Sequence, residues 1–154
     1  MHEIKASSQD FLAITGEVLH AGGNMRFEAH GKSMAPAIRD GDILVVCPLT
    51  RRVRAGDVLL AMSAQGRALV HRVLKVKRQA NGKLAFLLAG DANPYTDGWI
   101  MEDQALGSVA SIERKGKVKQ VTTVRNLFYL LQARTRFFYR RIAKKIRLSA
   151  STYL

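Results

Sequence analysis

Apolar and polar positions divide the chain into three zones with different periodicities. In the first zone, residues 8–21, apolar side chains recur at helical spacing and Gly22-Gly23 follows as a stop signal, which predicts a short helix. In the second zone, residues 25–119, short apolar runs alternate with turn sequences, which predicts β structure. The expected strands cover residues 25–29, 43–47, 58–62, 68–77, 83–89 and 106–114.

The β zone is expected to form one coiled or barrel-like sheet. The run 68–77 shows no clean two-faced alternation, which fits a strand inside a closed sheet better than a strand on an open surface. Asn81-Gly82 between two β-rich runs is a strong hairpin signal. We therefore expect a mainly β fold in three units: an N-terminal helical segment over 1–24, a β domain over 25–119 and a C-terminal helix over 120–154.

The third zone predicts a long amphipathic helix from Thr123 to Leu148. Its apolar residues recur at spacings of three, four and seven: Val124, Leu127, Phe128, Leu131, Phe138, Ile142 and Ile146. Arginine and lysine fill the remaining face. Two interpretations stay open, because the apolar stripe could pack on the β domain or lie in the interface of an anionic membrane.

Charge is distributed very unevenly along the 154 residues, whose formal net charge is +13. Residues 1–113 carry 13 Lys/Arg and 12 Asp/Glu, whereas residues 114–154 carry 12 Lys/Arg and no acid. A near-neutral body with a basic extension suggests contact with an anionic partner. We expect peripheral contact with anionic membrane through residues 114–147; nucleic acid is the weaker alternative, because no recognisable nucleic-acid-binding module accompanies the charge.

The expected location and cofactor content depend on three kinds of sequence signal: membrane-spanning runs, export signals and metal-ligand spacing. No run approaches the roughly 20 apolar residues of a membrane span, and the N-terminus lacks the features of an export signal. We expect a cytoplasmic protein, with a peripheral position on the inner membrane face as the alternative. The single Cys47 and the four histidines show no metal-ligand spacing, so neither a metal site nor a cofactor is expected.

Three short sequences suggest nucleophilic chemistry. Ser33 lies between a glycine and a proline just after a predicted strand, where a turn could expose its hydroxyl. His71 lies in an apolar strand and could act as a general base, and a loop further on presents Asp91 and Asp97 six residues apart. Either carboxylate could orient the imidazole. Taken singly, the serine fits an ordinary turn and the histidine an ordinary core position.

In this order the three elements resemble the signal peptidases of the S24/S26 clan, which share a coiled β fold. The resemblance runs from about Phe27 to Ile112. It rests on the Ser33-Met34-Ala35-Pro36-Ala37-Ile38 box, the Gly41-Asp42 and Gly56-Asp57 turns, the Val70-His71-Arg72-Val73 strand and the Gly90-Asp91-Ala92-Asn93 box. Histidine at the base position is similar to the histidine branch of the clan, found in archaeal, endoplasmic-reticulum and sporulation-type enzymes.

The resemblance implies a serine endopeptidase that cleaves a leader or signal-like peptide. Ser33 would be the nucleophile, His71 the general base and Asp97 its orienting carboxylate, with Asp91 as a supporting acid. Gly31, Met34 and Pro36 would contact the peptide or protein substrate. The resemblance also implies that this substrate binds extended, with small side chains preferred.

Several departures from the clan shape the expectation. We expect no N-terminal membrane anchor, and Gly31 stands where lysine-base relatives often carry a hydroxyl residue for the oxyanion. Self-cleavage is not expected, because the self-cleaving repressors of the clan carry a DNA-binding helix-turn-helix ahead of the peptidase fold, and the roughly 25 residues before the β zone are too few for that module. Two alternative functions stay open: a catalytically silent peptide-binding module on the same fold, and a basic adaptor that binds anionic lipid or nucleic acid through its C-terminal helix.

Overall fold

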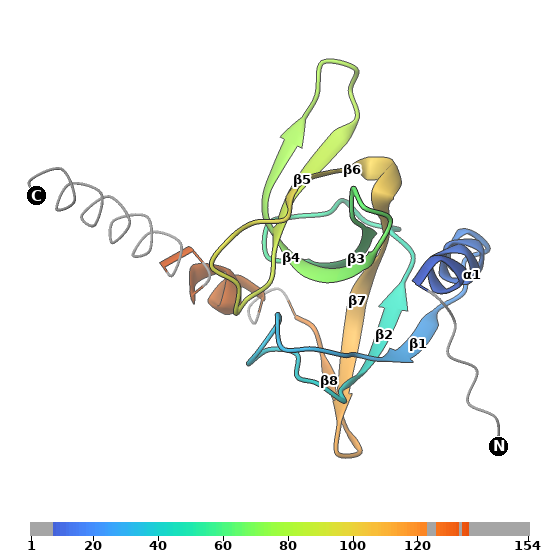
Figure 1. Ribbon diagram of the computed structural model, residues 1–154, viewed down its shortest axis with the longest axis vertical. Coiled ribbons are helices and arrows are strands. Elements are labelled where there is room, and N and C mark those ends of the chain that lie inside the picture. Colours follow the sequence, from blue (N-terminus) through green and yellow to red (C-terminus); the bar gives the residue numbers. More distant parts are fainter. Residues whose placement is uncertain (1–7, 123–125, 133, 136–154) are drawn as a thin grey trace, which may run out of the picture.

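The computed structural model describes residues 8–122, 126–132 and 134–135. The fold is mainly β, as predicted, with one N-terminal helix, α1 (Ser8–His20) (Figure 1). Its strands are β1 (Met25–Glu28), β2 (Ile43–Cys47), β3 (Val58–Met62), β4 (Ala68–Arg78), β5 (Leu84–Ala89), β6 (Gly98–Met101), β7 (Ala105–Arg114) and β8 (Lys117–Gln120). A short 3-10 turn, η1 (Glu102–Gln104), leads from β6 into β7.

The strands form one antiparallel eight-stranded sheet in the order β1-β2-β7-β3-β4-β5-β6, with β8 paired to β7. Register shifts interrupt the β2–β7, β3–β7 and β4–β5 ladders. Such bulges increase the local twist and let a sheet bend around its own core. The result is the coiled sheet seen in Figure 1, in which β3 and β4 curve around the centre.

Two apolar clusters fill the inside of this coil. One is built around β2, β7 and α1 and includes Leu44, Val46 and Leu19, while the other, around β3 and β5, includes Leu59 and Phe86. Helix α1 contacts β1, β4 and β7. Figure 1 shows α1 on one side of the coil and the described helical residues 126–132 on the other.

Most predicted elements match the structure within a few residues. The helix expected over 8–21 and the six expected strands are all present. The pattern missed β6, a four-residue strand that begins with glycine, and β8, whose residues are all exposed. Neither strand has the alternation of apolar and polar residues that identifies a half-buried strand.

The predicted C-terminal helix is described only in part. Residues 126–132 and 134–135 are helical, and the remainder of the expected helix over 123–148 lies outside the described residues. Within the described part, Leu130 is buried against Leu74 and Ala89, while Leu127, Phe128 and Leu131 are exposed. The predicted apolar stripe therefore does not pack on the β domain at its three described members. The face of the helix that carries Leu130 packs there instead.

Candidate active site

The loop that carries Ser33 is closed at its base by backbone hydrogen bonds. The Ala29 N–H donates to the Asp42 carbonyl at 2.7 Å, and the Gly41 N–H donates to the Ala29 carbonyl at 2.9 Å. Inside the loop, the Gly31 N–H donates to Asp40 Oδ1 at 2.8 Å. These contacts hold residues 29–42 in a compact loop between β1 and β2, and Ser33 is partly exposed in this loop.

Strand β4 brings His71 to this loop. His71 Nε2 lies 2.9 Å from Ser33 Oγ, and His71 Nδ1 lies 2.6 Å from Asp97 Oδ2. When Nδ1–H donates to Asp97, Nε2 is left as an acceptor for the Ser33 hydroxyl. The imidazole is largely buried, with its side chain 8% exposed, so its orientation is fixed by both partners.

The loop between β5 and β6 supplies the carboxylate and also contacts the nucleophile. The Asp97 N–H donates to the Leu88 carbonyl at 2.9 Å, and the Ala92 N–H donates to the Ser33 carbonyl at 2.7 Å. Gly90 packs so closely that a Cβ added there would lie 2.6 Å from the Ser33 carbonyl oxygen. Only glycine fits at this point, and the loop thereby ties the position of Ser33 to that of Asp97.

Asp91 has a different partner from the one expected of a supporting acid. Its two carboxylate oxygens each accept a hydrogen bond of 2.7 Å from Arg72, one from Nε and one from Nη2. Both side chains are buried, Arg72 to 1% and Asp91 to 5% exposure. The structure thus places Asp97, and not Asp91, on the imidazole, while Asp91 forms a bidentate ion pair on the neighbouring residue of β4.

The three residues expected to contact substrate lie around Ser33 in different environments. Gly31 and Pro36 are exposed. The Met34 side chain differs from the expectation, since it is 4% exposed and packs in the apolar cluster around β2 and β7. Met34 therefore anchors the loop in the core, and only its backbone is left for a role in substrate contact.

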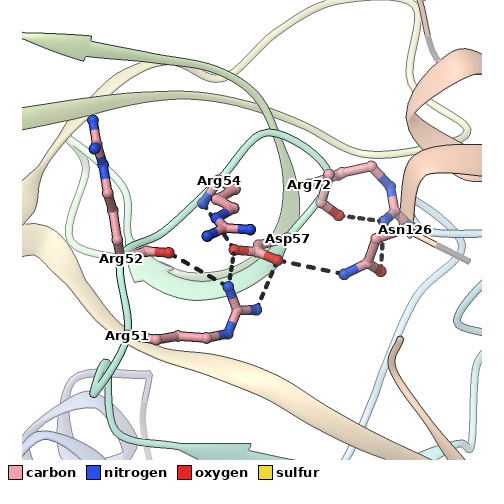
Figure 2. A network of polar contacts seen from close by, with 7 residues as sticks. Arg51, Arg52, Arg54, Asp57, Arg72 and Asn126 are labelled. Atoms are coloured by element: carbon pink, nitrogen blue, oxygen red, sulfur yellow. Dashed lines mark hydrogen bonds and ion pairs between the residues drawn. The ribbon is translucent and has the colours of Figure 1, made fainter. Parts of the chain in front are cut away.

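A second polar cluster behind β4 was not predicted from the sequence. Figure 2 shows Asn126 between Arg72 and Asp57, with Arg51 on the far side of Asp57. Arg51 pairs with Asp57 through two hydrogen bonds of 3.0 and 2.8 Å, and this hydrogen bonding raises the pKa of Arg51 against the opposing effect of burial. The Gly56-Asp57 turn was identified as part of the family pattern, but residue spacing gives no signal that Asn126 joins it.

A third ion pair, between a buried carboxylate and a partly exposed guanidinium, fixes the far end of the nucleophile loop. Arg114 donates to both oxygens of Asp42, at 2.7 and 2.6 Å, and the Arg39 N–H donates to Asp42 Oδ2 at 2.7 Å. Burial alone would raise the pKa of the Asp42 carboxyl, but the hydrogen bonds from Arg114 and Arg39 outweigh it and lower that pKa. The loop end is thus attached to the last residue of β7.

The described part of the chain holds neither a cluster of metal ligands nor a membrane-spanning helix. Among residues 8–122, 126–132 and 134–135, no three His, Cys, Asp or Glu side chains are grouped to hold a metal ion. No helix within these ranges has the length and apolar character needed to span a bilayer. The candidate chemistry rests on the hydrogen-bonded groups Ser33, His71 and Asp97.

Comparison with known proteins identifies the family. The family described as Peptidase S24-like matches residues 2–95, which is more than half of the chain. The chain belongs to the Peptidase S24-like family. The matched residues include Ser33, His71 and Asp91 and stop two residues before Asp97, so the assignment of Asp97 depends on the geometry rather than on the family match.

Curated relatives are signal peptidase subunits. The chain is 38% identical over 74 residues to the human signal peptidase complex catalytic subunit SEC11C, covering 46% of this chain and 38% of that protein. It is 38% identical over 66 residues to the catalytic subunit SEC11 of Eremothecium gossypii, covering 42% of this chain and 40% of that protein. The matches span less than half the length of these relatives. They support a serine peptidase of the signal-peptidase kind.

Proposed function

We propose that this protein is a serine endopeptidase that cleaves a leader or signal-like peptide by a Ser-His-Asp mechanism. The observation that carries the proposal is the continuous row of hydrogen bonds Ser33 Oγ···Nε2 His71 Nδ1···Oδ2 Asp97, at 2.9 and 2.6 Å. A nucleophile, a base and an orienting carboxylate in hydrogen-bond reach of each other form the arrangement that acyl transfer requires. The family membership supports the same reaction class.

Each group has one chemical task in this mechanism. His71 Nε2 accepts the Ser33 hydroxyl proton as Oγ attacks the carbonyl carbon of the scissile bond. The carbon–nitrogen bond then breaks, His71 donates the proton to the leaving amine, and an ester joins Ser33 to the acyl fragment. Water, deprotonated by His71, hydrolyses that ester and restores the serine. Asp97 stabilises the imidazolium that forms at both stages.

Backbone N–H groups stabilise the oxyanion in this proposal. Gly31 offers no side-chain donor, and its own N–H is occupied by Asp40. In the described part of the chain, the Ser33 N–H donates to no acceptor, which leaves it available for the tetrahedral oxygen. A site that lacks one side-chain donor would be slower by on the order of a hundredfold, but still active.

The substrate is proposed to be a peptide in extended conformation, bound by main-chain hydrogen bonds beside the Ser33 loop. The family pattern favours small side chains next to the scissile bond. Exposed Gly31 lets a peptide backbone approach closely at this point.

We further propose peripheral contact with anionic membrane through residues 114–147, on a protein that is otherwise cytoplasmic. The support is twofold: these residues belong to a stretch with 12 Lys/Arg and no acid, and Leu127, Phe128 and Leu131 expose 53, 56 and 55% of their surface. A surface that combines positive charge with exposed apolar side chains suits an anionic bilayer interface.

Peptide-library cleavage read by mass spectrometry tests the proposal. Wild type and Ser33→Ala are compared without vesicles, with neutral phosphatidylcholine vesicles, and with vesicles containing phosphatidylserine. We expect cleavage by wild type only, and stronger binding to the anionic vesicles than to the neutral ones. Peptide binding without cleavage would replace the enzyme by the silent binding module, and equal cleavage by Ser33→Ala would remove Ser33 from the mechanism.

A further inference from the structure

Asn126 has an unusual position for a residue so far along the chain from the β domain. Its side chain is buried, at 7% exposure, although it lies beyond β8 in a helical segment outside the sheet. Arg72 Nη1 donates to Asn126 Oδ1 at 3.3 Å, and Asn126 Nδ2 approaches Asp57 Oδ1 at 3.5 Å (Figure 2). One amide therefore joins two buried charged groups of opposite sign.

Tyr129 adds a second contact from the same segment. The Arg72 guanidinium carbon lies 5.3 Å from the centre of the Tyr129 ring, within the range of a cation–π interaction. Leu130 is buried beside Leu74, two residues further along β4. The segment 126–130 is thus attached to β4 by one amide, one ring and one apolar side chain.

Arg72 connects the segment 126–130 to two other parts of the structure by hydrogen bonds. Its Nη1 also donates to the Gly56 carbonyl at 2.7 Å, so both hydrogens of Nη1 are used, one on Gly56 and one on Asn126. Nε and Nη2 hold Asp91. A shift of the guanidinium would therefore move a turn on one side and the loop 90–97 on the other.

The loop 90–97 connects this cluster to all three groups of the proposed mechanism. In this loop Ala92 comes directly after Asp91, and the Ala92 N–H donates to the Ser33 carbonyl at 2.7 Å. The last residue of the loop is Asp97. His71 is the residue that precedes Arg72 in β4. His71 is therefore joined to Arg72 by a peptide bond, and Ser33 and Asp97 are each one hydrogen bond further away, through the imidazole.

We propose that Asn126 and Tyr129 are positioning residues for the catalytic site, which act through Arg72 and Asp91. The proposal rests on the proposed peptidase function. Without the Asn126 amide, one Nη1 hydrogen of Arg72 loses its buried acceptor and the guanidinium reorients toward another one, while Asp57 keeps its two hydrogen bonds from Arg51. The loop 90–97 then moves with the Arg72 guanidinium, and the distances from His71 to Ser33 and to Asp97 change. Displacements of this kind slow the chemical step more than they weaken substrate binding.

The test compares four single variants of the full chain with wild type. Asn126→Leu removes both amide hydrogen bonds at similar volume, and Tyr129→Leu removes the ring. Tyr129→Phe keeps the ring and is the conservative control, while Gln65→Ala alters an exposed residue in the turn between β3 and β4. We measure kcat and KM on a peptide that wild type cleaves, scaled by active-site titration with a fluorophosphonate, together with the thermal midpoint.

We expect kcat per titrated site to fall about tenfold in Asn126→Leu and Tyr129→Leu with KM nearly unchanged, and to stay within about twofold in Tyr129→Phe and Gln65→Ala. Unchanged kcat per titrated site in both leucine variants would overturn the proposal, whatever happens to their stability. If Asn126→Leu does not fold, the comparison of Tyr129→Leu with Tyr129→Phe decides.

A proton NMR measurement separates this proposal from the proposed function. The His71 Nδ1–H bonded to Asp97 should give a resonance at low field, assigned by its loss in His71→Gln. We expect it to shift or broaden in Asn126→Leu and Tyr129→Leu and to stay in place in the two controls. Absence of cleavage by wild type would end the peptidase proposal, yet this resonance would still report the positioning; an unmoved resonance in both leucine variants would contradict it.

Discussion

His71 and Arg72 are neighbours on β4, yet they build two polar clusters of opposite character. His71 joins a row of three groups, Ser33, His71 and Asp97, with Ser33 partly exposed at one end. Arg72 joins a cluster held by two ion pairs, in which Arg72 pairs with Asp91 and Arg51 pairs with Asp57. Successive residues of a strand point to opposite faces, which allows one strand to serve both clusters.

The difference between the two clusters reflects what each is able to do. A buried guanidinium is tolerated only where its hydrogens are all matched, because an unpaired charge in the interior is very costly. A reacting group, in contrast, must keep one direction unfilled for substrate. The row around Ser33 keeps one direction unfilled, whereas the hydrogen bonds of the Arg72 guanidinium are matched. The cluster around Arg72 can therefore hold the row around Ser33 in place.

The largest expected effect comes from breaking the row at its buried end. Asp97→Asn should lower kcat about a thousandfold to ten-thousandfold, because an amide favours the wrong imidazole tautomer and offers no negative charge to the imidazolium. The thermal midpoint should change little, since the asparagine keeps the shape. Kinetics on the peptide cleaved by wild type measure the effect, and Asp103→Asn, an exposed aspartate in η1, is the matched control. Retention of more than a tenth of the activity would exclude Asp97 as the orienting carboxylate.

The next effect is on stability and comes from the Arg72–Asp91 pair. Asp91→Leu leaves a buried guanidinium without its carboxylate and should lower the free energy of unfolding by about 3–5 kcal/mol. The double variant Arg72→Met with Asp91→Leu should recover part of this loss, because it removes both charges together. Urea titration of wild type, both single variants and the double variant measures the coupling. A double variant no more stable than Asp91→Leu would show that the other contacts of Arg72 matter more than the ion pair.

A smaller effect tests how closely the C-terminal segment approaches the sheet. Gly56 has a φ of +99°, and a Cβ there would lie 3.3 Å from the Asn126 carbonyl oxygen. Gly56→Ala should therefore lose about 1–3 kcal/mol from backbone strain and from displacement of the segment. Gly66→Ala is the control, because Gly66 has a φ of +72° and a Cβ added there would meet no atom within 4 Å. Equal losses of unfolding free energy in the two variants would mean that the contact with Asn126 adds nothing to the strain.

The smallest effect concerns the Asp42–Arg114 pair, which belongs to neither cluster. The folded-state pKa of Asp42 lies below its ordinary value of 3.8, so its ionised form stabilises the folded protein above that value. The stability difference between wild type and Asp42→Asn should be complete at neutral pH and should shrink as the pH falls from about 4 toward the lowered pKa. Urea titration between pH 7 and pH 3 measures it. A difference that grows on acidification would contradict the direction of the shift.

The sequence pointed to the candidate catalytic residues because each is marked by its immediate neighbours. Ser33 lies in a Gly-x-Ser-Met-x-Pro run, His71 in an apolar strand and Asp97 in a loop rich in turn residues. The order of these elements resembles one family, and family membership is confirmed. The histidine branch of that family stays a prediction, as does the division into three units. Asp91 was harder to place, because residue spacing alone leaves the two carboxylates equivalent and only the resemblance favoured Asp97 as the orienting group.

The sequence by itself therefore determined the class of fold, the positions of the main strands and the residues of the candidate chemistry, since local periodicity and local turns encode them. Only the tertiary structure decided that Asp91 pairs with Arg72, where the Met34 side chain lies, and that Asn126 reaches Arg72 and Asp57. The physical reason is that these contacts join residues as many as 69 positions apart along the chain. Their geometry is set by how the coiled sheet closes, and no periodicity along the chain records that closure.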